Sequence, residues 1–355
     1  MESASAADTE VLFSPYPLST HLTLSNRIVM APMTRCMADD NLTPTAAMAA
    51  YYARRADAGL IVTEGTIIRA DGQGYPNTPG IFSQQQIDGW REVTRRVHER
   101  GGKLFMQLWH VGRVSHPAYL NGAAPLAPSA APMSGPLPRT RQQLQYGTPR
   151  ALAADEIPAL TEAYATAAAN AMDAGVDGVE VHGANGYLID QFLHHQTNYR
   201  TDRYGGAPEN MARFALEVVD AVVARVRCER VGIRLSPGAY FNLEGRPDDV
   251  QVFDVLLPAL QQRGLAYLHT GIFDDATTFD YLGGTATAYL RRRYAGALIA
   301  CGSYTPQTAA WGIREERFDL IAIGRPLIAN PDFVAKVRRG ETLAPYDETM
   351  LGTLT

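Results

Sequence analysis

Eight short apolar runs are spaced along the chain, and helix-forming or irregular segments separate them. The runs cover residues 26–32, 60–65, 103–110, 177–181, 230–237, 265–271, 297–302 and 318–324. A strand that is covered on both faces is typically a short, nearly continuous apolar run, as in the parallel sheets of α/β proteins. We therefore predict eight buried strands.

Stretches of helical composition lie between most of these runs. They cover residues 45–58, 83–100, 156–174, 208–227 and 249–263, and a closing helix is predicted over 333–339. Strands and helices alternate along the chain, and the composition does not shift in a way that would mark a second domain. The pattern therefore predicts a single α/β domain, a (β/α)₈ TIM barrel, rather than a doubly wound sheet. No Gly-x-Gly-x-x-Gly fingerprint follows a strand, which argues against a Rossmann nucleotide domain.

Two segments interrupt the regular pattern. A long excursion over residues 111–150 follows the third strand, and a smaller one over 271–284 follows the sixth. Loops of such length in compact domains are usually lids or binding loops. We expect one domain over residues 1–355, with the barrel at about 18–340 and short irregular termini.

Composition and charge narrow the classes of function. The 355 residues are 46% hydrophobic and 19% charged, and the net charge is −5. Without a basic stripe, the chain has no electrostatic signature of nucleic-acid or anionic-membrane binding. No signal-peptide pattern and no run of roughly twenty apolar residues is present, so we expect a cytoplasmic protein, a monomer or homodimer, without a membrane partner. Cys36, Cys228 and Cys301 are far apart and lack metal-ligand spacing, so we predict free thiols and no metal site.

Three polar residues follow the fourth predicted strand, at the end where barrel enzymes build their sites. His182 and Asn185 can direct an imidazole N–H and an amide NH₂ at one oxygen. Tyr187 can supply a proton. A strand-end histidine, a capping asparagine and a core tyrosine remain the alternative interpretation.

The loops after the seventh and eighth strands begin with Gly302-Ser303 and Gly324-Arg325. Barrels bind phosphate through loop amides at this position, and an arginine adds a bidentate contact. Either dipeptide alone is also common in ordinary turns that bind no ligand. Their occurrence in both loops favours a phosphate site.

Thr34, Gln107 and Arg234 fall near the middle of the predicted barrel mouth and suit a planar heterocycle such as an isoalloxazine. Gln107 offers both a donor and an acceptor to a pyrimidine-like edge. Arg234 would place a fixed positive charge where a reduced flavin becomes anionic. The alternative for Arg234 is an ion pair with a carboxylate inside the barrel.

Five motifs in order resemble the Old Yellow Enzyme family of FMN-dependent ene-reductases, in particular its N-ethylmaleimide reductase-like members. They are Ala-Pro-Met-Thr-Arg at 31–35, Gln-Leu-Trp-His-Val-Gly-Arg at 107–113, His-Gly-Ala-Asn-Gly-Tyr-Leu at 182–188, Asn-Tyr-Arg-Thr-Asp-Arg-Tyr-Gly-Gly at 198–206, and Gly324-Arg325. The match runs from about Leu18 to Arg339.

The resemblance implies a barrel with non-covalent FMN that is reduced by NADPH or NADH, as in enzymes of the NADPH dehydrogenase type, and reoxidised by an activated alkene. Such alkenes include α,β-unsaturated ketones and aldehydes, maleimides and nitroalkenes. The FMN-binding residues it implies are Pro32, Met33, Thr34, Gly65, Gln107, Arg234, Gly302, Ser303, Gly324 and Arg325. By the same resemblance, His182 and Asn185 hold the substrate oxygen and Tyr187 protonates the α-carbon. Trp109 and Tyr75 line the substrate pocket.

The chain departs from the family pattern at three places. It resembles the branch with threonine at position 34, where a subgroup carries cysteine, and it has Asn185 where many relatives carry a second histidine. Its tail after Arg339 lacks the usual Gly-rich, aromatic ending. Tyr346 is the candidate for the aromatic side chain that the tail brings to the pocket.

Other barrel functions fit less well. A Schiff-base aldolase needs a lysine at a strand's carboxyl end, whereas Lys103 begins the third strand and Lys336 lies in the last helix. A metal-dependent hydrolase needs carboxylates beside its histidines, and His110, His182 and His269 lack such companions in the sequence pattern. The pair at 194–195 is predicted to lie in a turn.

Two alternatives on the same flavin barrel stay open. A dehydrogenase or isomerase would keep the same residues. A non-catalytic flavin protein that sequesters a phenol or steroid would need only the oxygen donors. Tyr187 favours the reductase, because sequestration requires no proton donor.

Overall fold

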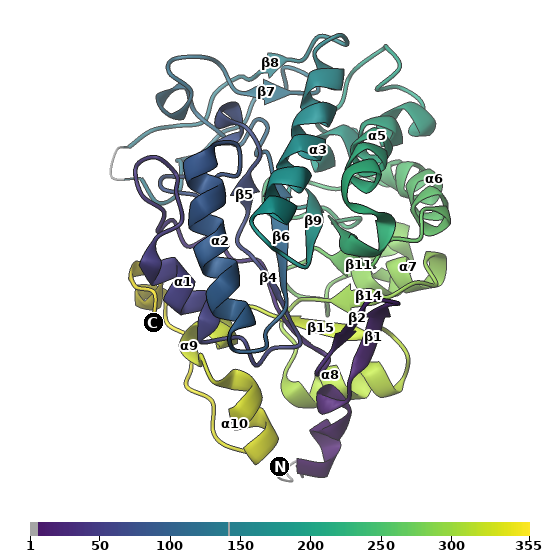
Figure 1. The fold of residues 1–355 in the computed structure, drawn as a ribbon. Coiled ribbons are helices and arrows are strands. Elements are labelled where there is room, and N and C mark those ends of the chain that lie inside the picture. Colours follow the sequence, from purple (N-terminus) through teal and green to yellow (C-terminus); the bar gives the residue numbers. More distant parts are fainter. Residues whose placement is uncertain (1–5, 141–142) are drawn as a thin grey trace.

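The computed structural model describes residues 6–140 and 143–355. Eight parallel strands of its central sheet form a closed barrel, in which the last strand pairs with the first, and a ninth, short strand, β5 (Thr66–Ile67), adjoins them (Figure 1). The eight barrel strands are β3 (Ile28–Met30), β4 (Leu60–Val62), β6 (Leu104–Trp109), β9 (Gly178–Gly183), β10 (Val231–Leu235), β11 (Tyr267–Thr270), β14 (Leu298–Ala300) and β15 (Leu320–Ile323). Each lies within or across one of the eight predicted runs. The predicted (β/α)₈ barrel is therefore confirmed.

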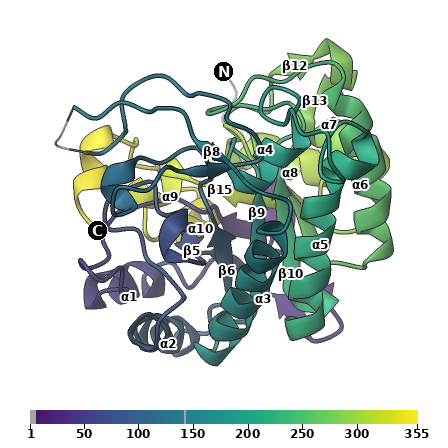
Figure 2. The ribbon, with the colours of Figure 1, turned by 90° about the horizontal axis from the view of Figure 1, so that it is seen from above.

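Helices surround the barrel, as the view from above shows (Figure 2). The predicted ones are α1 (Ala46–Ala53), α2 (Gln84–His98), α3 (Ile157–Asp173), α5 (Pro208–Val226), α6 (Asp249–Gln262) and α10 (Phe333–Arg339). The segments left unassigned in the sequence contain α4 (Leu188–Leu193), α7 (Ala286–Arg293), α8 (Pro306–Arg314) and α9 (Arg325–Ala329). Ser83 and Gln86 form a capping box at the start of α2, which satisfies amide groups that a helix leaves unpaired at its N-terminus. No helix in the described part of the chain is long and apolar enough to cross a bilayer.

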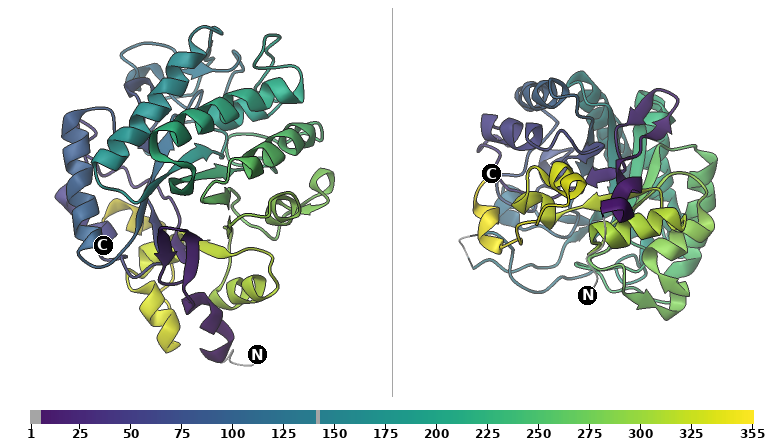
Figure 3. Two further views of the ribbon diagram at one scale, coloured as in Figure 1. Left: turned by 45° about the vertical axis from the view of Figure 1, so that its right-hand side comes forward. Right: turned by 90° about the horizontal axis from the view of Figure 1, so that it is seen from below.

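The amino-terminal segment is more ordered than the irregular start that we expected. Residues Ala6–Phe13 form a 3₁₀ helix, and β1 (Tyr16–Ser19) pairs with β2 (Leu22–Leu24) in a hairpin across the lower end of the barrel (Figure 3). Leu18 and Leu24 of this hairpin pack against Phe105 and Tyr267 inside the barrel. The expectation was wrong because burial of these few leucines outweighs the weak local pattern.

Both excursions are present. The one after β6 contains the short strands β7 (Leu126–Ala127) and β8 (Arg150–Ala151) and lies over the upper end of the barrel (Figure 1). Its residues 141–142 lie outside the described residues. The one after β11 contains the antiparallel pair β12 (Thr278–Phe279) and β13 (Gly284–Thr285). Because Arg139 of the first excursion donates a hydrogen bond to the Thr34 carbonyl, this excursion contacts the loop that follows β3.

Candidate active site

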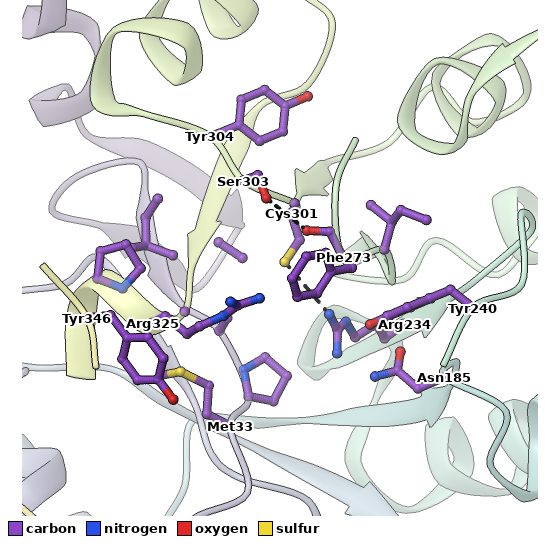
Figure 4. Close-up of a pocket in the computed structure, with 18 residues that line it drawn as sticks. Met33, Asn185, Arg234, Tyr240, Phe273, Cys301, Ser303, Tyr304, Arg325 and Tyr346 are labelled. Carbon is purple, nitrogen blue, oxygen red and sulfur yellow. Dashed lines mark hydrogen bonds between the residues drawn. The ribbon is translucent and has the colours of Figure 1, made fainter. Parts of the chain in front are cut away.

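A cavity of about 470 Å³ lies at the carboxyl ends of β3, β10, β14 and β15 (Figure 4). This volume falls in the range of small-molecule and cofactor sites. Seven of the ten predicted FMN-binding residues line it, namely Pro32, Met33, Arg234, Gly302, Ser303, Gly324 and Arg325. The substrate-binding candidate Asn185 also lines it.

Arg325 extends into one end of the cavity between two aromatic rings (Figure 4). Its guanidinium carbon lies 4.3 Å from the ring centroid of Phe273 and 5.9 Å from that of Tyr346. Gly302, which also lines the cavity, has φ +116°, and a Cβ there would come within 2.7 Å of the Asp275 amide nitrogen. The cavity wall therefore includes the cationic side chain of Arg325 and a backbone position that requires glycine.

Arg234 lies at the other end of the cavity. It is on β10, in register with His182 of β9 and His269 of β11. Its Nη2 donates to the Cys301 sulfur over 3.8 Å, and its buried Nε has no partner. Among the described residues Arg234 forms no ion pair with a carboxylate, so its charge is available to a ligand in the cavity.

Three predicted FMN-binding residues lie outside the cavity wall. Gln107 donates from Nε2 to the Glu180 Oε1 over 2.7 Å. Gly65 lies against Trp109, whose ring would collide with any Cβ at that position. Thr34 is half-buried, and its carbonyl accepts the hydrogen bond from Arg139. Their roles toward the cofactor stay predictions.

The predicted substrate-binding residues His182, Tyr187, Trp109 and Tyr75 form a buried aromatic cluster. The ring of Tyr187 lies 4.9 Å from Trp109 and 5.2 Å from His182, both edge-on, and Tyr75 stacks on Trp109 at 5.5 Å. The Tyr187 and Tyr75 hydroxyls are 2.8 Å apart. The sequence stretch around His182 thus brings these side chains together.

Several polar atoms of this region are buried without a partner. They are His182 Nδ1, Asn185 Oδ1 and Trp109 Nε1. Asn185 has a left-handed backbone (φ 62°), held by Ser236 Oγ on its amide and Asn242 Nδ2 on its carbonyl. Buried polar atoms are nearly always satisfied, and a left-handed non-glycine residue is uncommon. These features together indicate a ligand-binding site.

Burial sets the charge state of two of these side chains. It lowers the pKa of His182 well below its usual value, and the positive charges of Arg234 and His269 add to this effect. The imidazole is therefore neutral at pH 7 and can donate one N–H. Burial also raises the pKa of Tyr187 well above its usual value, and the neighbouring Tyr75 adds to the shift. The phenol consequently keeps its proton.

The carboxy-terminal segment brings Tyr346 to the cavity, the position for which the sequence offered it as a candidate. Buried arginines hold the residues that follow. Arg35 Nη2 donates to the carbonyls of Met350 and Thr353, and Arg55 Nη2 donates to that of Thr355. Tyr346 thus belongs to a tail that is anchored by buried arginines from the loop after β3 and from the end of α1.

The sequence interpretation did not assign four residues of the cavity wall to the site. Cys301, Tyr240, Phe273 and Tyr304 also line the cavity. Cys301 was detectable, because it immediately precedes Gly302 at a strand end. The others lie in loops without a motif.

The histidines differ from the expectation in two ways. His195 lies in a turn, as predicted, but the preceding His194 does not, and it is fully buried between Asp190 and Asp249. His269 Nδ1 has a carboxylate 2.8 Å away in Glu180, although the sequence pattern showed no companion acid. Within the described residues, no group of three or more His, Cys, Asp or Glu side chains is placed to hold a metal ion.

The comparisons with known proteins agree with this geometry. The sequence model of the NADH:flavin oxidoreductase / NADH oxidase family matches residues 11–343. The chain belongs to this family. This flavin oxidoreductase is 41% identical to rice 12-oxophytodienoate reductase 7 over 94% of the chain and 89% of the relative. It is 40% identical to a probable flavin mononucleotide-dependent alkene reductase of Leishmania infantum over 97% of the chain and 95% of the relative.

A solved structure is also similar. The Old Yellow Enzyme homologue of Zymomonas mobilis superposes with a TM-score of 0.90 at 37% identity, covering 96% of each chain. The resemblance to the Old Yellow Enzymes is therefore confirmed.

The cavity fits FMN, the cofactor of this family. A flavin mononucleotide has a dianionic phosphate at one end and a pyrimidine ring that becomes anionic on reduction at the other. The cavity offers Arg325 at one end and the incompletely paired Arg234 at the other. These two cations match the two places where FMN carries negative charge.

Proposed function

We propose that this flavin oxidoreductase reduces the C=C bond of activated alkenes with NADPH or NADH as the reductant. The observation that carries the proposal is the position of Tyr187. This protonated, buried phenol lies 5.2 Å, ring to ring, from the unsatisfied imidazole of His182. A proton donor beside oxygen-binding groups is what alkene reduction requires and what ligand capture does not.

His182 and Asn185 bind the carbonyl or nitro oxygen of the alkene in this proposal. Both are anchored, His182 on β9 and Asn185 through Ser236 and Asn242. Donors fixed in this way stabilise the negative charge that develops on the oxygen as the double bond is reduced. FMN, when bound, would supply the hydride that the β-carbon receives, and Tyr187 delivers the proton to the α-carbon.

The cofactor roles are part of the same proposal. Arg325, Gly302, Ser303 and Gly324 hold the phosphate, and Pro32 and Met33 support the ring system. Arg234 and Gln107 bind the pyrimidine edge, and Thr34 and Gly65 complete the flavin contacts. For Gln107, Thr34 and Gly65, which lie outside the cavity wall, the support is the family resemblance alone, and Thr34 supports membership of the threonine-bearing branch. Trp109 and Tyr75 line the alkene pocket.

An anaerobic titration tests the proposal. Purified protein is treated with NADPH and then with 2-cyclohexenone while its flavin absorbance is followed. Bleaching followed by recovery supports both half-reactions. Bleaching without recovery would instead favour a dehydrogenase, an isomerase or a phenol- or steroid-sequestering protein, and a protein that takes up no FMN would refute the cofactor roles.

Finer properties belong to the same proposal. They are an activity of the NADPH dehydrogenase type, one domain over residues 1–355, a cytoplasmic location where reduced nicotinamide nucleotides are available, and a monomeric or homodimeric state. Rates measured with NADPH and with NADH test the activity of the NADPH dehydrogenase type. Size-exclusion chromatography with light scattering tests the oligomeric state.

A further inference from the structure

Cys301 occupies a position that the proposed function does not use. It directly follows β14 and lines the cofactor cavity, with its sulfur directed at Arg234 (Figure 4). The Arg234 Nη2 lies 3.8 Å from this sulfur. Since the other guanidinium atoms have no carboxylate partner among the described residues, Cys301 is the group that competes most directly with a cofactor for the charge of Arg234.

Polar side chains of the barrel interior extend toward Cys301. Gln107 donates to Glu180, and the other oxygen of Glu180 lies 2.8 Å from His269 Nδ1. The remaining His269 nitrogen, Nε2, is buried without a hydrogen-bond partner, and His269 is close enough to Cys301 to lower the pKa of its thiol. Gln107 and Arg234 are both predicted flavin contacts.

The neighbours of Cys301 favour its ionised form. Burial alone would raise the pKa of the thiol, but the interaction with His269 and the positive charge of Arg234 outweigh burial and leave the pKa lowered. His269 is itself charged more readily than usual. Burial opposes its protonation, but the Glu180 carboxylate outweighs burial and raises the pKa. Glu180 thus favours the charged form of His269, and His269 and Arg234 favour the charged form of Cys301.

We propose that the Cys301 thiolate holds down the reduction potential of the bound flavin by neutralising part of the positive charge that Arg234 offers to the pyrimidine ring. Flavin reduction takes a hydride from NAD(P)H, which leaves as NAD(P)⁺, and places one negative charge on that ring. A thiolate at the same guanidinium disfavours this added charge by like-charge repulsion. Cys301 thereby sets how readily the enzyme accepts a hydride and how readily it passes the hydride on.

The inference rests on the proposed placement of Arg234 at the pyrimidine ring, but not on which alkene reoxidises the flavin. Its test is therefore the midpoint potential of the FMN-loaded protein, measured by anaerobic dye equilibration. Cys301→Ser removes the negative charge and keeps a small polar group. Cys301→Ala serves as a second variant. Cys228→Ser is the matched control, because Cys228 lies in the 3₁₀ turn before β10 and outside the cavity wall.

We expect both Cys301 variants to increase the equilibrium constant for two-electron reduction at least tenfold, which is a positive shift of about 30 mV. The control should match the unmodified protein. In the unmodified protein, we also expect the slope of the midpoint potential against pH to change where the thiol ionises. This change of slope should be absent in Cys301→Ser. An unchanged or more negative potential in both variants would overturn the inference, whether or not 2-cyclohexenone is reduced.

Discussion

The hydroxyl oxygens of Tyr75 and Tyr187 lie 2.8 Å apart inside a buried aromatic cluster. Either oxygen can be the donor, so Tyr75 can return a proton to Tyr187 after Tyr187 has given its own to a substrate. The excursion after β6 adds Tyr146 and Met133 to the same cluster. The pair therefore connects the proposed proton donor to the covering loop.

Replacement of the proposed acid tests its role directly. We expect Tyr187→Phe to slow flavin reoxidation by 2-cyclohexenone by roughly 10²- to 10⁴-fold, the usual contribution of a positioned general acid. Stopped-flow absorbance measures this step by itself. Flavin reduction by NADPH is the internal control and should stay within about twofold, because it uses no proton from Tyr187. Unchanged reoxidation would show that another group supplies the proton.

Tyr75→Phe removes only the hydrogen-bond partner of the acid. One hydrogen bond contributes about 1 kcal/mol, so we expect a loss of roughly fivefold in the same reoxidation step. The ring keeps its stack on Trp109, which separates the hydroxyl from the packing. A loss as large as that of Tyr187→Phe would mean that Tyr75, not Tyr187, is the immediate donor.

The lowered pKa of His182 predicts the pH dependence of substrate binding. Because its folded pKa lies well below the usual value, the imidazole is neutral throughout the range from pH 6 to 8. We expect the KM for 2-cyclohexenone to be constant across this range, as measured by initial rates under saturating NADPH. A tenfold change centred near pH 6.5 would instead indicate a histidine that titrates in the free enzyme.

The buried triad Asp190, His194 and Asp249 predicts a pH-dependent stability. Burial disfavours the charged imidazole, but the two carboxylates outweigh burial and raise the pKa of His194 to about 10. The stabilisation is thus full below the unfolded pKa of about 6.5. It is lost as the pH rises through about 10, because the folded state then releases the proton.

His194→Gln should therefore destabilise the protein by roughly 3–5 kcal/mol near pH 6, the cost of leaving a buried charge unpaired. The difference from the unmodified protein should shrink toward pH 10. Urea unfolding at several pH values measures it. His21→Gln is the control, since the His21 side chain is exposed and lies outside this cluster; a pH-independent difference for His194→Gln would contradict the charged triad.

Arg325 is expected to dominate the affinity for the phosphate of FMN. A charge-assisted hydrogen bond contributes about 1.5–3 kcal/mol, so Arg325→Ala should raise the Kd for FMN roughly 10- to 100-fold in a fluorescence titration of the flavin. Arg317→Ala is the control, because Arg317 also stacks on an aromatic ring, Trp311, but lies outside the cavity. Equal affinities for the two variants would remove Arg325 from the phosphate site.

The barrel was predictable from sequence because each strand is a compact apolar run whose burial is nearly complete, as in β9. His182, Asn185 and Tyr187 were predictable because they follow one strand within a few residues of one another. Trp109 and Tyr75, which complete the aromatic cluster, were expected only from the family resemblance. Relationships between distant segments were not predictable. The contact between Arg234 and Cys301 joins residues 67 positions apart, and His194, which follows α4, is paired with Asp249 at the start of α6. No local pattern encodes either partner.

The cavity wall joins residues 31–33 to residues 322–326 across the pair of β3 and β15 that closes the barrel. A flavin held there bridges the earliest and the latest strands of the barrel. The wall exists only when these two strands are paired, so the site is complete only in the closed barrel. A ligand that binds only the closed form also stabilises closure, so FMN bound there would oppose separation of the first and last strands of the barrel.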